Sequence, residues 1–413
     1  MARGAVEMEE KMRPLSGIRV LGLEQYITGP YCTMLLADAG AEVIKIEPPG
    51  SGDPRRSLPP FAVNQRGEKS SGGFMRFNRN KKSLTLDLKQ EQGKEIFRAL
   101  ITKSDVIVEN FRPDTMERLG FGYAIIRQLN PAIIYATLSG FGRMETLRGP
   151  YWDRPGFDIV FQAMGGLMHN VGEKDGPPLF LGVPLADIYT PMVAAYGIVM
   201  ALRMRDKTGF GQYVDIAMYD CMTALNEGSV LIHSYNGEIP GRDQPRLQAP
   251  QCAFQTKDGY VALIVPTEDM WVRFCKAIER EDLIKHPLCS SGVLRGKNFD
   301  SFLRPILDEW FGQRTNDEAM QHLLKQGVPV GPSQTAKELV ECPQLKARKM
   351  ILDIEDPVGG KKKIVGSPVK LSAAPETSPQ TAPRLGEHTE EILENLLGFS
   401  QEKISELRKG RVI

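Results

Sequence analysis

Asp187 is the residue whose surroundings most favour chemistry, in the segment Pro184-Leu-Ala-Asp-Ile-Tyr-Thr190. The apolar run Leu179–Leu185 is typical of a strand, and the pattern from about Met192 to Met204 is typical of a helix. An acid at a strand-to-helix junction stands where α/β enzymes carry reactive side chains. Partial dehydration and the positive end of a helix dipole would suit a nucleophile. On this segment alone, a helix cap is the commoner role.

Asp158 is the second carboxylate that could take part. It opens the predicted helix Asp158–Met168, so it is either the cap of that helix or an acid that tunes the proton of Asp187. No Ser-His-Asp or Cys-His pairing is evident, and the absence of a G-x-S-x-G motif disfavours a serine hydrolase. The candidate chemistry therefore centres on carboxylates.

Two segments could bind a nucleotide. Residues 110–112 (Asn-Phe-Arg) end a buried strand and suit an adenine ring with its phosphates, or form only a turn before Pro113. The basic run 78–82 and Lys89 flank the predicted strand Ser83–Leu88, where they could neutralise phosphates or remain solvated. The first strand-turn-helix lacks G-x-G-x-x-G, so no dinucleotide site is expected.

Composition points to a soluble globular enzyme of two or three domains. The 413 residues are 41% hydrophobic and 25% charged, and 52 basic residues balance 51 acidic ones. No global field favours nucleic acid or a membrane surface, and the apolar stretch Pro191–Leu202 is too short to span a bilayer. The six cysteines form no C-x-x-C pair and no cluster with histidines, which predicts free thiols, no metal site and a cytoplasmic location.

The order of elements predicts an α/β fold. Strands and helices alternate from Gly17 to Met218, which indicates a mostly parallel sheet with helices on both faces. Asn236–Pro250 reads as a linker, and a smaller α+β domain follows it. We expect a large domain over 1–225, a small domain with linkers over 226–332, and a return to the large domain over 333–413.

The segments occur in an order that resembles the class III coenzyme A transferases, whose superfamily also contains α-methylacyl-CoA racemase. The matching motifs are PLSGIRVL (14–21), Gly29-Pro30, AGAEVIKIE (39–47), GDPR (52–55), NKKS (80–83), VENFRP (108–113), RPGFD (154–158), LAD (185–187), KTGFGQ (207–212), Asp258-Gly259 and LGEHT (385–389). They extend over nearly the whole chain, and their joint order is far more specific than any one of them.

The resemblance implies a fold and a reaction. It implies a Rossmann-like large domain, an inserted small domain and an interlocked homodimer. It also implies that Asp187 attacks an acyl-CoA thioester and gives a mixed anhydride, then an aspartyl-CoA thioester that a carboxylic acid discharges. No metal or prosthetic group is expected, and coenzyme A enters as a substrate. Such an intermediate needs a site that excludes water.

The resemblance also assigns binding residues by position. Asp158 and Arg154 would lie near the nucleophile and the pantetheine end. The positions that match residues lining the CoA nucleotide are Leu86, Asp87, Lys89, Asn110, Phe111, Arg112, Arg118 and Leu119.

Two departures bear on the reaction. Phe157 stands where the racemase branch has a histidine, and a phenyl ring cannot exchange a proton, which disfavours the alternative of an acyl-CoA racemase or isomerase. Ile27 stands where formyl-CoA transferase has a glutamine, and residues 246–251 contain no glycine run. We therefore expect a larger, partly apolar acyl group rather than oxalate or formate.

Overall fold

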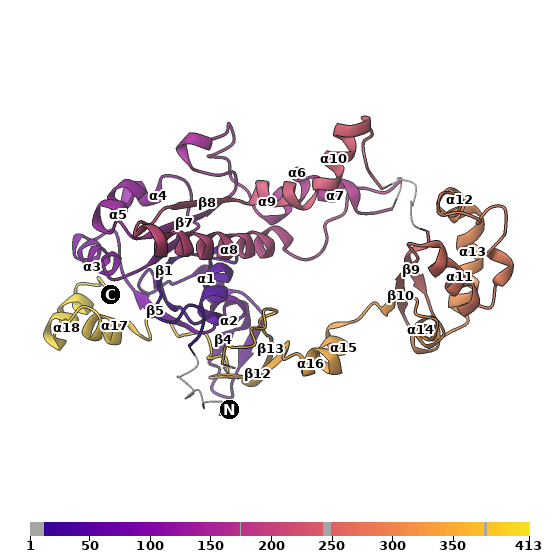
Figure 1. Ribbon diagram of the computed structural model, residues 1–413. Coiled ribbons are helices and arrows are strands. Elements are labelled where there is room, and N and C mark those ends of the chain that lie inside the picture. The colour runs from indigo at the N-terminus through magenta and orange to yellow at the C-terminus, as the bar shows by residue number, and fades with distance from the viewer. Residues whose placement is uncertain (1–11, 174, 243–248, 376–377) are drawn as a thin grey trace, which may run out of the picture. The chain divides into compact units, whose positions relative to one another are not determined.

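The computed structural model describes residues 12–173, 175–242, 249–375 and 378–413 (Figure 1). It contains two compact units, residues 1–239 with 349–413, and residues 240–348. Both divisions fall later in the chain than the predicted boundaries. Residues 226–239 therefore belong to the large unit, and residues 333–348 belong to the small unit.

A six-stranded parallel sheet forms the centre of the large unit. Its strands lie in the order β5-β2-β1-β6-β7-β8, and every neighbouring pair is parallel. Numbered along the chain, this is the order 3-2-1-4-5-6 of a doubly wound sheet, so the predicted α/β class with a parallel sheet is confirmed. The strands are β1 (Arg19–Leu23), β2 (Glu42–Glu47), β5 (Lys81–Thr85), β6 (Val106–Glu109), β7 (Ile134–Ser139) and β8 (Tyr213–Ala217).

Helices cover both faces of this sheet. Leu36 of α1 and Ile198 of α8 pack with Val20 on one face, whereas Phe97 of α3 and Leu393 of α17 pack with Leu21 on the other. Adjacent strand residues thus enter opposite cores, as the strand period requires. The helices of the large unit are α1 (Thr28–Asp38), α2 (Gly72–Asn78), α3 (Glu91–Ile101), α4 (Thr115–Leu119), α5 (Tyr123–Leu129), α6 (Asp158–Met164), α7 (Leu167–Asn170), α8 (Leu185–Thr208), α9 (Met218–Leu225), α10 (Glu227–Asn236), α17 (Thr389–Asn395) and α18 (Gln401–Lys409).

The C-terminal segment closes the sheet edge at β5. The backbone N–H of Gly386 donates to Ser83 Oγ at 2.9 Å, and the N–H of Thr85 donates to Thr389 Oγ1 at 3.1 Å. Gly386 has φ +68°, and a Cβ there would come within 2.9 Å of Thr85 Oγ1, so this turn favours glycine. The motif LGEHT (385–389) therefore joins the chain's end to its first half.

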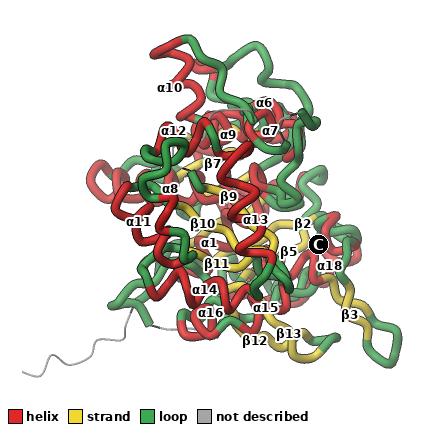
Figure 2. The backbone as a smooth tube through the Cα atoms, turned by 90° about the vertical axis from the view of Figure 1, so that its right-hand side faces the viewer, coloured by secondary structure: helices red, strands yellow, loops and turns green. Residues whose placement is uncertain are grey.

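Two hairpins extend from the large unit. They are β3 (Phe61–Val63) with β4 (Lys69–Ser71), and β12 (Ile351–Asp356) with β13 (Gly360–Val365), each pair antiparallel. Figure 2 shows β3 and the turn after it reaching away from the sheet. Ser70 Oγ donates to Asp356 Oδ1 at 2.7 Å, which ties the hairpins together.

The small unit is α+β, as predicted. Its antiparallel sheet has the order β11-β10-β9, and helices pack against it around Trp271, Phe254 and Phe311. Its elements are β9 (Gln251–Gln255), β10 (Tyr260–Ile264), α11 (Glu268–Ala277), α12 (Gly292–Lys297), α13 (Arg304–Gly312), α14 (Asn316–Lys325), β11 (Val330–Pro332), α15 (Ala336–Glu341) and α16 (Pro343–Ala347).

The prediction of a strand over Leu179–Leu185 is wrong. Residues 179–184 are irregular, and α8 begins at Leu185, earlier than expected. Gly182 and Pro184 interrupt the run, and Leu179, Phe180 and Leu181 are exposed rather than buried in a sheet. An apolar run by itself does not show that the segment pairs with other strands in a sheet.

A buried ion network supports the loop after β1. Lys45 Nζ donates to Asp53 Oδ2 at 2.9 Å and to the carbonyl oxygen of Glu24 at 2.8 Å. Lys81 Nζ donates to Glu24 Oε1 at 3.1 Å, and all three side chains of Glu24, Lys45 and Lys81 are fully buried. Burial by itself lowers the pKa of Lys45, but Glu24 and Asp53 outweigh it and raise that pKa. Lys45 is therefore held as a cation, whereas burial lowers the pKa of Lys81 to about 8 against the opposing effect of Glu24.

Lys45→Met tests this network. The change leaves the carboxylates of Glu24 and Asp53 short of a cation in a buried site, so we expect a loss of about 3–5 kcal/mol in unfolding free energy. Urea denaturation at pH 7 measures it. The control Lys363→Met breaks the exposed pair with Asp353 and should cost less than about 1 kcal/mol. Equal small losses would contradict the assignment.

Candidate active site

Asp187 lies in the first turn of α8 and faces the start of α1. Thr28 Oγ1 donates to Asp187 Oδ1 at 2.8 Å. Among the described residues no donor bonds to the other oxygen, Oδ2. Asp187 is half-buried, so one carboxylate oxygen is fixed and the other is available to a substrate.

Asp158 holds the start of α8 from a different helix. Its Oδ1 accepts the backbone N–H of Ala186 at 2.7 Å and of Asp187 at 3.2 Å, and its Oδ2 accepts Gln162 Nε2 at 2.7 Å. The N-cap position of α8 is Pro184, and Asp187 makes no capping bond, so the alternative role of Asp187 as a helix cap is not supported. Asp158 makes no capping bond within its own helix, α6, and instead supplies the cap of α8.

The two acids share a poorly solvated environment. Burial raises the pKa of Asp187 to about 6, the Thr28 hydroxyl lowers it, the charge of Asp158 raises it, and Arg55 lowers it. Burial also raises the pKa of Asp158, although its bonds to the N–H groups of Asp187 and Ala186 and to Gln162 oppose that shift. At neutral pH Asp187 is therefore mostly a carboxylate, but one with little stabilisation from water.

The loop that carries Thr28 is fixed at the point where the strand order reverses. Asn110, after β6, accepts from the N–H of Gln25 and donates to its carbonyl oxygen, both at 2.9 Å. A Cβ on Gly29 would overlap the Cβ of Glu24 and come within 3.0 Å of the Asn110 amide, so only glycine fits. β1 and β6 are neighbours whose chains leave toward opposite sides, which is where doubly wound sheets bind ligands.

Comparison with known proteins decides the family. Residues 15–389 match CoA-transferase family III. The chain belongs to this family, and it is a class III CoA-transferase.

Three curated relatives span nearly the same length. The succinyl-CoA:mesaconate CoA-transferase of Haloarcula hispanica is 39% identical over 388 residues, covering 93% of this chain and 96% of that protein. The succinyl-CoA–D-citramalate CoA-transferase of Chloroflexus aurantiacus is 36% identical over 404 residues, covering 97% and 98%. A formyl-CoA:oxalate CoA-transferase of Rhodopseudomonas palustris is 36% identical over 419 residues, covering 96% of each chain.

The fold has a solved counterpart. The crystal structure of a CAIB/BAIF family protein from Brucella suis superposes with a TM-score of 0.82 at 33% identity, covering 93% of this chain and 99% of that chain. The parallel sheet described above is therefore the fold of a known group of proteins.

In this class III transferase, the three residues that were expected to bind CoA and that follow β5 have different surroundings. Leu86 is buried in the core. Asp87 Oδ1 accepts the N–H of Lys89 at 3.0 Å, and its Oδ2 accepts Gln90 Nε2 at 3.1 Å. The Lys89 side chain is exposed. Of these three, only Lys89 presents a free charge, and Asp87 shapes its turn.

The expected CoA-binding residues that follow β6 are likewise partly committed to contacts within the protein. Asn110 is occupied with Gln25, as above, and Leu119 packs against the core that contains Met116. Phe111 is half-buried, and its N–H donates to Glu109 Oε2 at 2.7 Å.

Three arginines complete the expected set, and all are exposed. Arg112 donates to the carbonyl oxygen of Asp153 at 2.8 Å, and Arg118 donates to Thr115 Oγ1 at 3.1 Å. The Arg154 guanidinium lies 3.7 Å from the centre of the Tyr151 ring. Their cationic heads remain open to a phosphate.

Sequence reasoning missed Thr28, Gln162 and Arg55. Thr28 directly precedes the Gly29-Pro30 motif, a hydroxyl at a helix start, and that was the available signal. Gln162 lies one turn after Asp158 on α6, at the spacing where side chains meet. No local pattern indicates that Arg55 influences Asp187, because that proximity arises only on folding.

Three positions carried the expected reaction and acyl-group preference, and the structure describes Phe157, Ile27 and part of the third. Phe157 is 73% exposed just before α6, next to Asp158, and offers no proton-exchanging group. Ile27 is half-buried just before α1. Residues 246–248 lie outside the described residues. The relatives include proteins named for oxalate and for larger acids, so the preference against oxalate stays a prediction.

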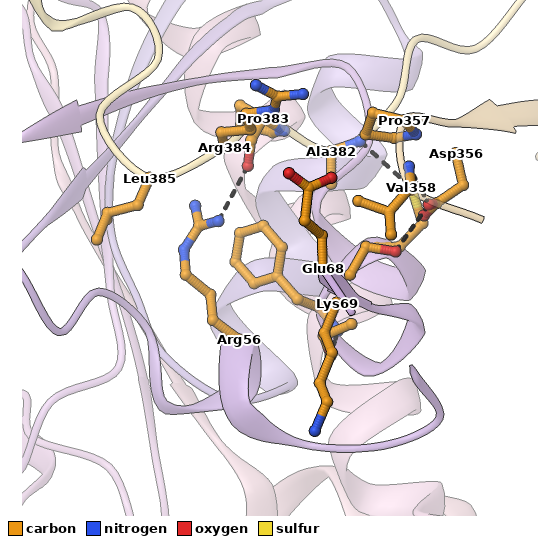
Figure 3. A pocket seen from close by; sticks show the side chains of 14 residues that line it. Arg56, Glu68, Lys69, Asp356, Pro357, Val358, Ala382, Pro383, Arg384 and Leu385 are labelled. Atoms are coloured by element: carbon orange, nitrogen blue, oxygen red, sulfur yellow. Dashed lines mark hydrogen bonds between the residues drawn. The ribbon is translucent and has the colours of Figure 1, made fainter. Parts of the chain in front are cut away.

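A separate cavity of about 360 Å³ lies where the β3–β4 hairpin meets the returning chain (Figure 3). Arg56, Glu68, Lys69, Asp356 and Arg384 are among its lining residues. Thr28, Asp158 and Asp187 are not. Arg56 is already occupied, since it donates to both oxygens of Glu47 and to the carbonyl oxygen of Pro383. The cavity therefore lies within the large unit, between the β3–β4 hairpin and the C-terminal part of the chain that returns to this unit.

Thr28→Val should raise the pKa of Asp187 above its value of about 6, because the hydroxyl that stabilises the carboxylate is lost. Thr28→Ser keeps the hydroxyl and is the matched control. NMR titration of protein carrying ¹³C in aspartate carboxyl groups measures the midpoint, and Asp187→Asn identifies the resonance. A midpoint that does not rise in the valine variant would contradict the role of Thr28.

Proposed function

We propose that this enzyme transfers CoA from an acyl-CoA to a carboxylic acid with Asp187 as the covalent nucleophile. The observation that carries the proposal is a carboxylate with one oxygen fixed by Thr28, the other without a donor among the described residues, and a pKa of about 6. Such a group is ionised at neutral pH and poorly hydrated, which favours attack on a carbonyl carbon.

The reaction balances without a further reactant. Asp187 Oδ2 attacks the thioester carbonyl, the C–S bond breaks, and a mixed anhydride and CoA thiolate result. The thiolate attacks the aspartyl carbonyl, releasing the donor as its carboxylate and leaving an aspartyl-CoA thioester. The acceptor carboxylate attacks that thioester, and the thiolate is released again. The thiolate then attacks the acyl carbonyl of the new anhydride, giving the new acyl-CoA and free Asp187.

The neighbours of Asp187 suit these steps. The Thr28 hydroxyl orients the free carboxylate of Asp187 before it attacks. Asp158 fixes the backbone of Asp187, and its own negative charge disfavours leaving Asp187 ionised. The acylated forms of Asp187 carry no charge, so acylation relieves that repulsion.

Two relatives support short dicarboxylic acids as substrates. Their names pair succinyl-CoA with mesaconate and with D-citramalate. Each of these acids keeps a second carboxylate when the first is joined to CoA. We propose donors and acceptors of this class for the present chain.

Asp187→Asn should abolish transfer by at least about 10³-fold while leaving CoA binding within about threefold. Intact-mass analysis after incubation with succinyl-CoA should detect a covalent adduct on Asp187 in the wild type only.

The variant should also change the stability of the fold. Ionised Asp187 lowers the free energy of unfolding, because its folded pKa lies above the ordinary value, and this loss grows as pH rises through about 6. The variant should thus be at least as stable as wild type at pH 8. Asp206→Asn, at the exposed far end of α8, is the control, and adduct formation in Asp187→Asn would refute the proposal.

We further propose a homodimer that covers the outer face of α8. One face of this helix is buried through Ala194, Ile198 and Ala201. The other presents Tyr196 and Met200, 65% and 47% exposed, in a stripe that also contains Met192, Val199 and Met204. By length and composition alone α8 could cross a membrane, but 39% of its most apolar 18-residue stretch is already buried inside the protein. A second copy of the chain accounts for the remaining face.

The double variant Tyr196→Glu with Met200→Glu should convert a dimer into a monomer, because two charges would be buried in an apolar contact. Light scattering coupled to size-exclusion chromatography measures the mass. Leu147→Glu changes a residue that is 78% exposed elsewhere and should leave the dimer intact. A monomeric wild type, or a dimeric double variant, would contradict the proposed interface.

A further inference from the structure

Two arginines of the large unit lie beside the same aromatic ring, and neither pairs with an acid among the described residues. The guanidinium carbons of Arg55 and Arg76 lie 5.3 and 4.8 Å from the centre of the Phe77 ring. Arg55 Nε donates to the carbonyl oxygen of Gly73 at 2.9 Å. Among the described residues neither arginine forms an ion pair, and the terminal nitrogens of Arg55 have no acceptor.

Their neighbours in the sequence are fully paired. Arg56 forms two hydrogen bonds to Glu47, at 2.8 and 2.7 Å. Arg79 forms two to Asp38, at 3.0 and 2.6 Å. This part of the chain thus supplies acids for two arginines and leaves the other two open. Two unpaired cations beside one ring repel each other, and an anion bound near both would offset that repulsion.

The pair lies on the side of the molecule that carries the nucleophile. Arg55 is close enough to Asp187 for each to influence the pKa of the other. Tyr31 packs edge-on against Phe77 at 5.7 Å and is one helical turn from Thr28, which bonds to Asp187. The first turn of α1 therefore connects the arginine pair to the reacting carboxylate.

Backbone contacts fix Arg55 in this place. Asp53 Oδ1 accepts the N–H of Arg55 at 2.9 Å and the N–H of Tyr26 at 3.3 Å, while Asp53 Oδ2 accepts Lys45 Nζ. The buried network beneath the loop thus also sets the backbone from which Arg55 extends. An anchored guanidinium with free terminal N–H groups is suited to a carboxylate, which it can bind in a fork.

We propose that Arg55 and Arg76 bind the distal carboxylate of a dicarboxylic acyl group whose thioester carbonyl is presented to Asp187. This inference rests on the proposed function and adds to it the residues that select the acid. The pair would offset the repulsion between a second carboxylate on the substrate and the proposed carboxylate nucleophile. The phosphates of CoA are the other anion that such a pair could hold, and the experiment separates the two.

Succinyl-CoA and butyryl-CoA are the probes, since their four-carbon acyl groups differ only in ending with a carboxylate or a methyl group. The rate of adduct formation on Asp187 is measured by rapid quenching and intact mass for wild type, Arg55→Gln, Arg76→Gln and the double variant. Arg66→Gln, an exposed arginine in the β3–β4 turn, is the matched control. Arg55→Lys tests whether charge alone suffices.

We expect the wild type to prefer succinyl-CoA, and Arg55→Gln to lower that preference by about 10- to 100-fold, as for a lost charge-assisted hydrogen bond. Arg76→Gln should lower it less, and Arg66→Gln should not change it. Arg55→Lys should recover only part of it. If Arg55→Gln does not fold, the exposed Arg76→Gln still gives a decisive comparison.

Three results would overturn the inference. A wild type that treats both donors alike, or a preference unaffected by both substitutions, would exclude the carboxylate role. Equal losses with both donors, together with weaker binding of CoA itself, would assign the pair to phosphate. If instead no donor modifies Asp187 in the wild type, the proposed function itself fails, which is a distinguishable outcome.

Discussion

The proposed chemistry depends on keeping one carboxylate poorly hydrated and yet ionised. Burial opposes the charge on Asp187, and the Thr28 hydroxyl restores part of its stability. Asp158 contributes in two ways, because it bonds to the N–H groups at the start of α8 and adds a negative charge nearby. The N–H groups of Ala186 and Asp187 are thereby bonded to Asp158. A carboxylate in this state is closer in free energy to its acylated forms than a solvated one would be.

The second constraint is the loop between β1 and α1. It must hold Thr28 at a fixed place, and it does so over a set of buried ions rather than an apolar core. Lys45 and Lys81 bond to the carbonyl oxygens of Glu24 and Pro30 as well as to carboxylates. Buried ions cost desolvation free energy, but they fix geometry through directional bonds. The same Asp53 that pairs with Lys45 also accepts the backbone N–H groups of Tyr26 and Arg55, so one network fixes two segments near the proposed nucleophile.

Helix α8 joins this site to the proposed interface. Its first turn carries Asp187, and its later turns are apolar on opposite faces, of which one packs on the sheet through Ile198 and the other exposes Tyr196. A soluble helix with one core-facing stripe needs no second apolar stripe. The second stripe therefore places the proposed dimer contact on the same helix that carries the proposed nucleophile.

The sequence by itself determined the sheet and the identity of the acids. Most strands of the sheet are short, largely apolar runs, although β5 is largely polar, and the helix of Thr28 began where expected, because local periodicity and burial leave a direct trace in residue type. The apolar run 179–184 led to a wrong prediction, because its side chains are exposed and the sequence pattern does not distinguish exposed apolar residues from buried ones.

Only the tertiary structure decided what surrounds Asp187. Thr28 lies 159 residues away in the chain and Asp158 lies 29 away. Contacts over such separations arise from the packing of whole elements, so no local pattern records them. For the same reason, folding alone revealed that Asp158 caps a helix other than its own and that Arg55 lies near Asp187.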